Sequence, residues 1–202
     1  MYSLYYKPLA CSLAVHIVLI ELNLAHELLC VSKAGNVLMS GDRPLSEIHI
    51  PATVPLLKTP AGDVMAETAV ILEYLAEQVE EGHLFPDRND KDYWKYRQMM
   101  NFIATDIHKN YGPLFNADIS EPMKDVWMRR FKDRLSYVQG TISDEGFIYG
   151  MKFSAVDCYL FVMLHWTSYV GIDLQDWPNL KRYYDNLSGR PSVRQALAIE
   201  VP

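Results

Sequence analysis

The first 32 residues alternate strand, helix and strand, and this order limits the possible folds more than any other feature of the chain. Apolar and aromatic residues predict a strand at 3–6, and a second apolar strand is predicted at 27–32. The helix predicted over 12–24 has apolar residues spaced to form one helical face: Leu13, Ile17, Ile20 and Leu24. Strand, helix and strand in this order predict two parallel strands joined by a right-handed crossover.

A hairpin and a helix follow this unit. Residues 33–50 show no regular pattern, whereas 54–59 and 64–66 flank a Pro-Ala-Gly-Asp turn and predict a β-hairpin. A helix predicted over 68–79 closes the unit. The N-terminal part is therefore expected to be an α/β unit of order βαβ-ββα, with a small mixed sheet and helices on its faces.

The pattern changes after residue 80. Residues 81–90 are polar and contain Gly82 and Pro86, which predicts a linker. The rest is helical, with helices predicted at 91–110, 121–142, 155–170, 178–187 and 192–199. Ser154 and Asp157 have the spacing of an N-terminal capping box for the third of these helices. We therefore predict two domains, 1–80 and an all-helical 91–202, joined by 81–90.

Composition narrows the partners and the compartment. The chain has 202 residues and a net charge of −6, which argues against nucleic-acid binding. Its three cysteines lack metal-ligand spacing and are odd in number, which suits a reducing compartment without a disulfide framework. Cys30 and Cys158 are expected in the core. We see no signal-peptide pattern, and the apolar stretch 155–172 contains Asp157 and His165, so we expect a soluble cytoplasmic protein with no metal and no membrane segment.

Cys11 is the first candidate for chemistry. It lies directly before the helix that is predicted to begin at Ser12, where unpaired main-chain N–H groups and the helix dipole favour a thiolate. No second cysteine stands at the C-x-x-C spacing, so the expected partner is a small thiol such as glutathione. The alternative is a buried cysteine that only packs in the core.

Two further pairs stand in the same predicted unit. Pro55 begins a predicted strand after Val54, and a cis Val54–Pro55 bond would turn the main-chain groups of Val54 toward an extended peptide. X–Pro bonds are cis in only about 5–6% of cases, so an ordinary strand start is the favoured interpretation. Glu67 and Thr68 open the closing helix, where they suit the amine and carboxylate of a γ-glutamyl group. Plain helix capping is equally open for this pair.

A polar stripe is predicted on the first helix after the linker. Asn101, Thr105 and His108 fall at i, i+4 and i+7 and share one face of an α-helix, with Lys109 adjacent. Most such stripes are solvated surfaces. This one combines an amide, a hydroxyl and an imidazole, which also suits a binding site, and His108 would titrate near neutrality.

These motifs together resemble the bacterial beta-class glutathione transferases over nearly the whole chain. The resemblance rests on Tyr5–His16 (Tyr-Tyr-Lys-Pro-Leu-Ala-Cys-Ser-Leu-Ala-Val-His), Val54-Pro55, Glu67-Thr68, Asn101–Lys109 and Phe153–Asp157. It implies a thioredoxin-like N-terminal domain, a helical C-terminal domain of the same family and a homodimer. It also implies glutathione as co-substrate and a small hydrophobic electrophile as the second substrate.

The resemblance also implies site residues. Cys11, Val54, Pro55, Glu67 and Thr68 would contact glutathione. Asn101, Thr105, His108 and Lys109 would join from the helical domain, some of them across the dimer interface. Cys11 and His108 are the predicted catalytic residues, with Cys11 held as a thiolate.

The chain departs from the family pattern at Val15, where proline is usual, and in two further places. Leu9 stands where glycine is usual and would narrow the cleft beside the thiol. In 33–50, Asn36 or Val37 falls where the family has a lysine that reaches glutathione, and Lys33 is a poorly spaced substitute. Loss of that charge-assisted hydrogen bond would weaken binding by about one to two decades.

The predicted function is transfer of glutathione to small electrophiles in detoxification, with thiol–disulfide exchange or peroxide reduction through Cys11. Tyr111, Phe115, Trp166 and Tyr169 are candidates for the electrophile pocket, and Tyr6 is a candidate for lining the cleft. The other histidines are interpreted as structural or surface residues without convergent partners. Two alternatives stay open: a non-catalytic binding or scaffold protein of the same fold, and a specialised glutathione-dependent dehalogenase or isomerase.

Overall fold

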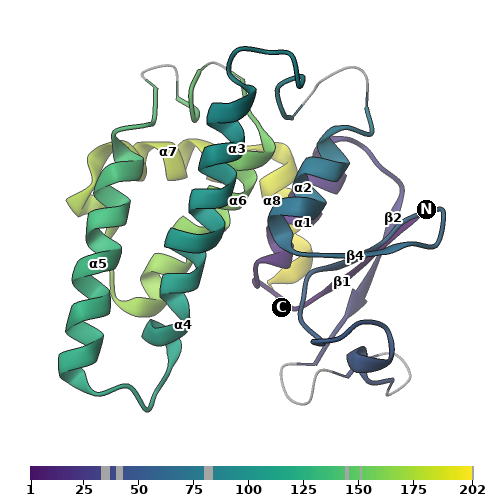
Figure 1. Cartoon of the computed structure of the whole chain (residues 1–202), viewed down its shortest axis with the longest axis horizontal. Coiled ribbons are helices and arrows are strands. Elements are labelled where there is room, and N and C mark those ends of the chain that lie inside the picture. The colour runs from purple at the N-terminus through teal and green to yellow at the C-terminus, as the bar shows by residue number, and fades with distance from the viewer. Residues whose placement is uncertain (33–36, 40–42, 80–83, 144–145, 151, 202) are drawn as a thin grey trace. The chain divides into compact units, whose positions relative to one another are not determined.

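The first 32 residues form the predicted crossover. In a computed structural model of the chain, β1 (Tyr2–Tyr6), α1 (Ser12–Glu21) and β2 (His26–Cys30) follow one another, and β1 pairs with β2 in parallel (Figure 1). The structure describes residues 1–32, 37–39, 43–79, 84–143, 146–150 and 152–201. The predicted order of elements is confirmed in this part of the chain.

The sheet is completed by the hairpin. Strand β3 (Leu56–Lys58) pairs antiparallel with β1, and β4 (Val64–Ala66) pairs antiparallel with β3, which gives the order β2-β1-β3-β4. Pro55 lies just outside β3, so its missing N–H removes no hydrogen bond from the sheet. The four-stranded mixed sheet and its helices have the predicted thioredoxin-like arrangement.

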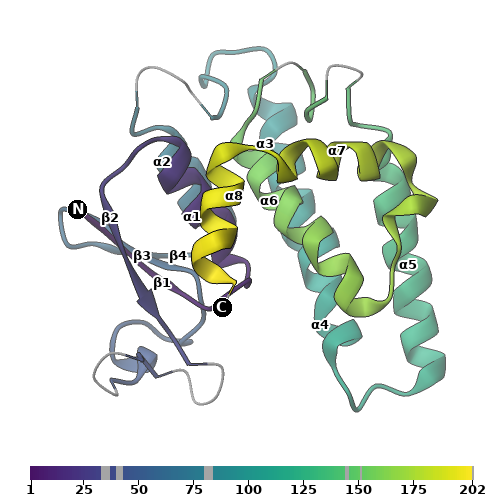
Figure 2. The same ribbon diagram turned by 180° about the vertical axis from the view of Figure 1, so that it is seen from behind.

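Helices from both ends of the chain pack together in this part of the molecule. Helix α1 packs against α2 (Thr68–Ala76), and α8 (Pro191–Glu200) packs along α1 (Figure 2). The apolar faces of α1, α2 and β1 meet in the core, where Leu4, Leu13, Ile17 and Leu72 are fully buried. Only α1 and α2 were expected here, because α8 comes at the far end of the sequence.

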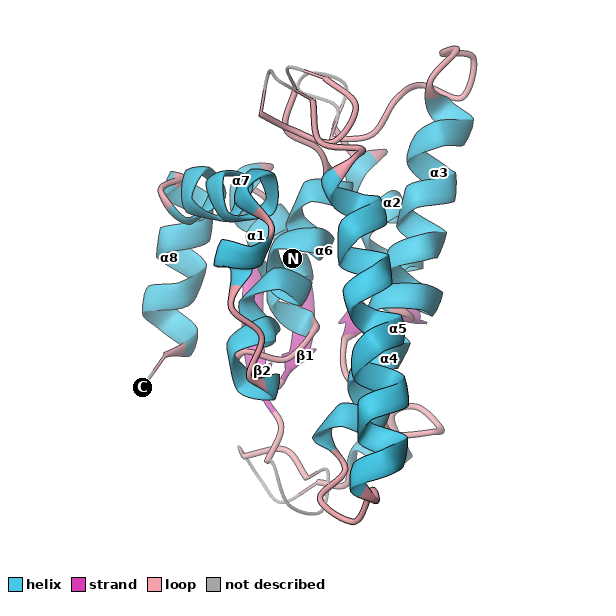
Figure 3. Ribbon diagram, turned by 90° about the vertical axis from the view of Figure 1, so that its left-hand side faces the viewer, coloured by secondary structure: helices cyan, strands magenta, loops and turns pink. Residues whose placement is uncertain are grey.

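The chain divides into two compact units: Met1–Leu84 together with Arg190–Pro202, and Phe85–Gly189. The second unit is helical. It contains α3 (Tyr93–Phe102), a π-helical turn (Ile103–His108), α4 (Lys109–Phe115), α5 (Glu121–Gln139), α6 (Ala155–His165) and α7 (Pro178–Ser188). Among the described residues, the strands β1 to β4, magenta in Figure 3, all belong to the first unit. The predicted domain limits 1–80 and 91–202 stay a prediction, and 81–83 of the predicted linker lie outside the described residues.

Helix α6 forms the centre of the second unit. All its residues from Ala155 to Leu164 are buried, and it contacts α3, the π-helical turn and α7. The predicted capping box is confirmed, because the Ser154 hydroxyl accepts the N–H of Asp157 and the Asp157 carboxylate accepts the N–H of Ser154. None of the helices in the described residues is long and apolar enough to span a bilayer.

Several predicted helices end early. The helix predicted over 12–24 stops at Glu21, because Asn23 has a positive φ of 50°. The helix predicted over 155–170 ends at His165 and continues as a 3₁₀ turn (Trp166–Val170). The most consequential difference is at 91–110, where one α-helix was expected and α3 gives way to the π-helical turn.

Candidate functional site

Cys11 lies at the N-terminal end of α1, as predicted, and is 7% exposed. It follows a turn in which Ala10 N–H donates to the carbonyl of Lys7 and the Ser12 hydroxyl donates to the same carbonyl. The Cys11 thiol donates to the main-chain carbonyl of Val54, with Sγ and O 3.5 Å apart. The sequence therefore brings together a helix terminus and the segment that precedes β3.

The Val54–Pro55 peptide bond is cis. The interpretation favoured from the sequence, an ordinary trans strand start, is therefore wrong. That interpretation rested on the low frequency of cis X–Pro bonds, and no feature of the local sequence indicates the cis form. Pro55 is buried, and Val54 is half-buried beside Cys11.

Glu67 and Thr68 stand at the start of α2 and face the same thiol. Thr68 is buried, and its hydroxyl hydrogen-bonds the Cys11 sulfur. Glu67 is exposed and has a φ of 69°, a conformation that few residues other than glycine adopt. Within the first unit, four predicted residues thus converge on one place: Cys11, Val54, Glu67 and Thr68.

The predicted ionisation of Cys11 is wrong for this structure. Burial raises the pKa of the Cys11 thiol above its ordinary value, and the nearby charge of Glu67 raises it further. Hydrogen bonds from the Thr68 hydroxyl and from the N–H groups of Cys11 and Ser12 lower the pKa without cancelling the effect of burial. The thiol is therefore neutral at pH 7, which agrees with its role as donor to Val54.

Glu200 supports the turn before Cys11 and was not predicted from the sequence. Its carboxylate accepts the main-chain N–H of Leu9 at 2.9 Å and lies 2.8 Å from Nδ1 of His16. The side chains of His16 and Glu200 are fully buried. The expectation that His16 has no convergent partner is wrong, because its partner comes from the other end of the chain.

Leu9 adopts a φ of 58° in this turn. Lys33 and Asn36, considered above for the missing lysine contact, lie outside the described residues, while Val37 is half-buried. Tyr6 is half-buried at the end of β1, and burial with the neighbouring Cys30 raises the pKa of its hydroxyl. Cys158 is buried as expected, but Cys30 is only half-buried because it stands on the edge strand β2.

The other predicted residues belong to the second unit. Thr105 and His108 lie in the π-helical turn, Asn101 near the end of α3, and Lys109 at the start of α4. The Thr105 hydroxyl donates to the carbonyl of Asn101 at 3.0 Å. In a π-helical turn the main-chain hydrogen bonds join residues five apart. The α-helical spacing assumed for the stripe therefore does not apply to it.

His108 packs against α6. Its Nδ1 lies 2.7 Å from the Tyr159 hydroxyl, and its ring meets that of Trp166 edge to face at 5.3 Å. Burial lowers the pKa of His108 to about 4, and the charge of Lys109 contributes in the same direction. The expectation that His108 titrates near neutrality is wrong, because burial disfavours the charged ring. A neutral imidazole has one donor and one acceptor nitrogen.

Three of the four aromatic candidates form one cluster. Trp166 contacts Tyr111 and Phe115 with ring centroids 5.3 and 5.6 Å apart, and Phe115 is 47% exposed. Tyr169 is not among these contacts. It meets His165, whose Nδ1 is 2.8 Å from the Tyr184 hydroxyl, so His165 also has partners that the sequence did not indicate.

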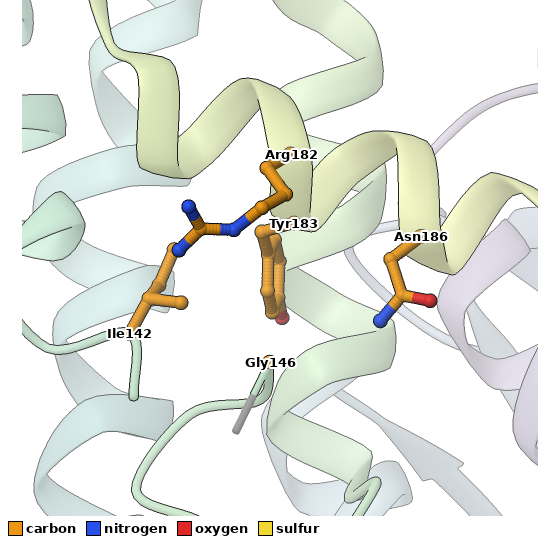
Figure 4. Close-up of a pocket in the computed structure, with 5 residues that line it drawn as sticks. All are labelled: Ile142, Gly146, Arg182, Tyr183 and Asn186. Atoms are coloured by element: carbon orange, nitrogen blue, oxygen red, sulfur yellow. The ribbon is translucent and has the colours of Figure 1, made fainter. Parts of the chain in front are cut away.

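A pocket of about 320 Å³ lies elsewhere in the second unit. Figure 4 shows that Arg182, Tyr183 and Asn186 reach into it from α7, and Ile142 and Gly146 complete its lining. It contains no predicted site residue, and residues 144–145 beside it lie outside the described residues. Across the described ranges, no group of three or more His, Cys, Asp or Glu could hold a metal ion.

The chain matches two family models. Residues 10–78 match the model described as "Glutathione S-transferase, N-terminal domain", and residues 99–191 match "Glutathione S-transferase, C-terminal domain". Together the two matches cover most of the chain.

Relatives agree with these matches. The chain is 33% identical over 198 residues to glutathione S-transferase GstA of Escherichia coli O157:H7, which covers 98% of each protein. It is similar to a sphingomonad glutathione S-transferase solved with glutathione, with 32% identity, 98% of each chain covered and a TM-score of 0.92. It is also similar to the beta-class enzyme of Sphingomonas chungbukensis, with 33% identity, 98% of each chain covered and a TM-score of 0.91.

Proposed function

This chain belongs to the glutathione S-transferase family, and from that premise we propose which of its residues bind glutathione and act on its sulfur. The activity is transfer of glutathione, which serves as co-substrate. In the conjugation reaction, the glutathione sulfur forms a bond to an electrophilic atom, while the thiol proton and the leaving group depart. The active form of the nucleophile is the thiolate.

The convergence on Cys11 is the observation that supports the binding site. Glutathione would lie extended along Val54, with Pro55 packed behind it. Its γ-glutamyl end would meet Glu67 and the first N–H groups of α2, where charge and main-chain donors fit an amine and a carboxylate. The sulfur would then lie beside Cys11, whose thiol already pairs with the Val54 carbonyl.

The neutral Cys11 thiol gives this residue two roles. It can donate a hydrogen bond to the glutathione thiolate and so stabilise the charged sulfur before conjugation. It can also lose its proton to solvent and attack oxidised glutathione, forming a Cys11–glutathione disulfide and releasing one glutathione thiolate. Because burial raises its pKa, the second role requires a larger share of thiolate than neutral pH supplies.

His108 would act from the helical domain as a neutral group. With the Tyr159 hydroxyl on Nδ1, the opposite nitrogen Nε2 is available to donate to a thiolate when it carries the proton. Asn101, Thr105 and Lys109 would bind the rest of the tripeptide, some of them from the second protomer of a homodimer. The exposed ring of Phe115 on the buried Trp166 suits a small hydrophobic electrophile.

The remaining proposals concern the oligomeric state, the location and the biological role of the protein. A homodimer, a cytoplasmic location and a role in detoxification are in keeping with the family and with three cysteines that form no disulfide. Size-exclusion chromatography with light scattering measures the oligomeric state. A mass of about 46 kDa, twice the 23.2 kDa of the chain, is expected.

The proposal is tested by intact mass spectrometry after exposure to oxidised glutathione. We expect one glutathione adduct on the native protein, one on Cys30→Ser, and none on Cys11→Ala. Cys30→Ser is the matched control because Cys30 is the more exposed of the two other cysteines. An adduct that persists on Cys11→Ala would place the reactive sulfur elsewhere.

Conjugation to an aryl halide separates the two roles of Cys11. We expect Cys11→Ala to keep measurable conjugation, because the attacking sulfur belongs to glutathione, and to lose exchange. Loss of conjugation with exchange intact would contradict this order. Retention on a glutathione resin, released by free glutathione, tests binding itself, and a protein that is retained but never turns over would instead support a scaffold role.

A further inference from the structure

The π-helical turn Ile103–His108 decides where His108 points. Main-chain hydrogen bonds in such a turn join residues five apart, so the side chains that follow it face a different direction than in an uninterrupted α-helix. The turn lies between α3 and α4, which are labelled in Figure 1. Turns of this kind are rare, and most occur as single turns inside α-helices.

One residue, Asp106, receives the polar contacts that hold the turn. Its main-chain carbonyl accepts a hydrogen bond from the side-chain amide of Asn110. Its carboxylate accepts from Arg134 Nε on α5 at 3.0 Å. The Thr105 hydroxyl lies 3.1 Å from the same carboxylate and shares its one proton between it and the Asn101 carbonyl. The turn is thus tied on one side by a buried amide and on the other by an ion pair to α5.

The buried side chain of Asn110 lowers the stability of the native state. It is 1% exposed, and within the described residues its Oδ1 atom has no hydrogen-bond partner. A buried polar atom without a partner destabilises the native state, and a leucine would fill a similar volume without one. The contact of Nδ2 with Asp106 is therefore the feature that accounts for an asparagine here.

His108 stands two residues before Asn110 and depends on the same turn. Its ring is held by the Tyr159 hydroxyl and the ring of Trp166, both of which belong to the same unit as the turn. If the turn relaxed to a regular α-helix, the direction of His108 relative to α6 would change. The hydrogen bond between Nδ1 and the Tyr159 hydroxyl, which holds the ring in place, would then be lost.

We propose that Asn110 and the Asp106–Arg134 pair are positioning residues that keep the turn π-helical and thereby hold His108 on Tyr159. The proposal rests on the proposed role of His108 for its effect on the reaction. Its structural part concerns the imidazole itself and is measured without substrate. The two can therefore fail separately.

The experiment uses two variants of the full chain and one control. Asn110→Leu removes the amide, and Asp106→Asn weakens the pair with Arg134 at a half-buried position where folding survives substitution more easily. Thr59→Val is the matched control, because Thr59 is also buried, its Oγ1 has no hydrogen-bond partner among the described residues, and it lies outside the proposed site. His108→Ala reports on the reaction alone.

The first readout is the ¹H–¹⁵N spectrum of the His108 ring. We expect one neutral tautomer in the native protein and in Thr59→Val. We expect a mixture of tautomers, with a pKa at least about one unit closer to 6.5, in Asn110→Leu and Asp106→Asn. Unchanged ring signals in both variants would overturn the proposal, whatever happens to the melting temperature.

The second readout is the kinetics of aryl-halide conjugation. We expect kcat to fall about tenfold in Asn110→Leu, with the KM for glutathione within about twofold of the native value. A fall in kcat with the His108 signals unchanged would overturn the positioning role. If His108→Ala retains the native kcat, the proposed role of His108 fails, and the tautomer measurement still decides whether Asn110 positions the ring.

Discussion

At Cys11, burial and hydrogen bonding act against each other. The helix terminus supplies the N–H donors that the sequence predicted, and their effect on the pKa has the predicted sign. Burial of the sulfur by neighbouring residues is the larger effect, because removing the charged thiolate from water destabilises it more than a few hydrogen-bond donors stabilise it. The free protein therefore holds a thiol, and a bound substrate would have to change the surroundings to make it a thiolate.

Alkylation of Cys11 measures this balance. In a Cys30→Ser background at pH 7, we expect iodoacetamide to react slowly, because less than about 3% of a thiol with a pKa above 8.5 is ionised. The rate should rise steadily beyond pH 9. Thr68→Val removes a hydrogen bond that lowers the pKa, so it should slow the reaction further. A rate already half-maximal below pH 7 would contradict this account.

His108 gives a second pH prediction. Its folded pKa of about 4 lies below the unfolded value of about 6.5, so the neutral ring stabilises the native state above pH 6.5. As the pH falls from 6.5 to 4, His108 binds a proton in the unfolded chain but not in the native state. The free energy of unfolding should then fall by roughly 1.4 kcal/mol per pH unit from this residue.

The comparison of native protein with His108→Gln in urea unfolding isolates that contribution. The free energies of unfolding of the two proteins should depend differently on pH between pH 4 and 6.5 and in the same way above pH 6.5. A His108 ring signal that titrates near 6.5 in the folded protein would show that burial does not control this group.

Helix α6 shows how a local signal and the core reinforce each other. The Ser154–Asp157 capping box is readable from the sequence, and the fold buries both residues. Asp157 also accepts the N–H of Ile148 and the hydroxyl of Tyr183. The start of the central helix is thus tied to the preceding loop and to α7.

Ser154→Ala tests the cap. It removes the acceptor for the N–H of Asp157, and we expect the free energy of unfolding to fall by about 1–2 kcal/mol. Ser120→Ala is the matched control, because Ser120 occupies the same position before α5 but makes no side-chain cap hydrogen bond. Urea unfolding of both variants provides the measurement, and equal losses would mean that the cap itself contributes nothing.

Taken as a whole, the chain joins its two ends in one unit. Arg190 and Ser192 bind Glu21 at the end of α1, and Glu200 meets His16 in the middle of that helix. The last helix therefore completes the unit that carries Cys11. The sequence had assigned it to the helical domain, because periodicity reveals a helix but not its neighbour.

Removal of Glu200 is expected to be costly. Glu200→Ala removes the carboxylate that pairs with the fully buried His16 and accepts the N–H of Leu9, so we expect a loss of about 3–5 kcal/mol. Glu47→Ala breaks an exposed pair with Arg43 and should cost less than about 1 kcal/mol. Urea unfolding midpoints distinguish the two variants. Similar losses would show that the buried pair contributes no more to stability than the exposed pair.

The sequence by itself determined the order of the elements, the crossover, the hairpin, the α6 cap and the position of Cys11 at a helix terminus. These features depend on residues close together in the chain, where periodicity, turn residues and caps act. The family could also be recognised, because its motifs are short and keep their order along the chain.

Only the tertiary structure decided the cis bond at Pro55, the π-helical turn, the neutral states of Cys11 and His108, and the place of α8. Each depends on atoms brought in from distant parts of the chain: Val54 beside Cys11, Tyr159 beside His108, Glu200 beside His16. Ionisation above all follows from burial, and burial is a property of the packed molecule.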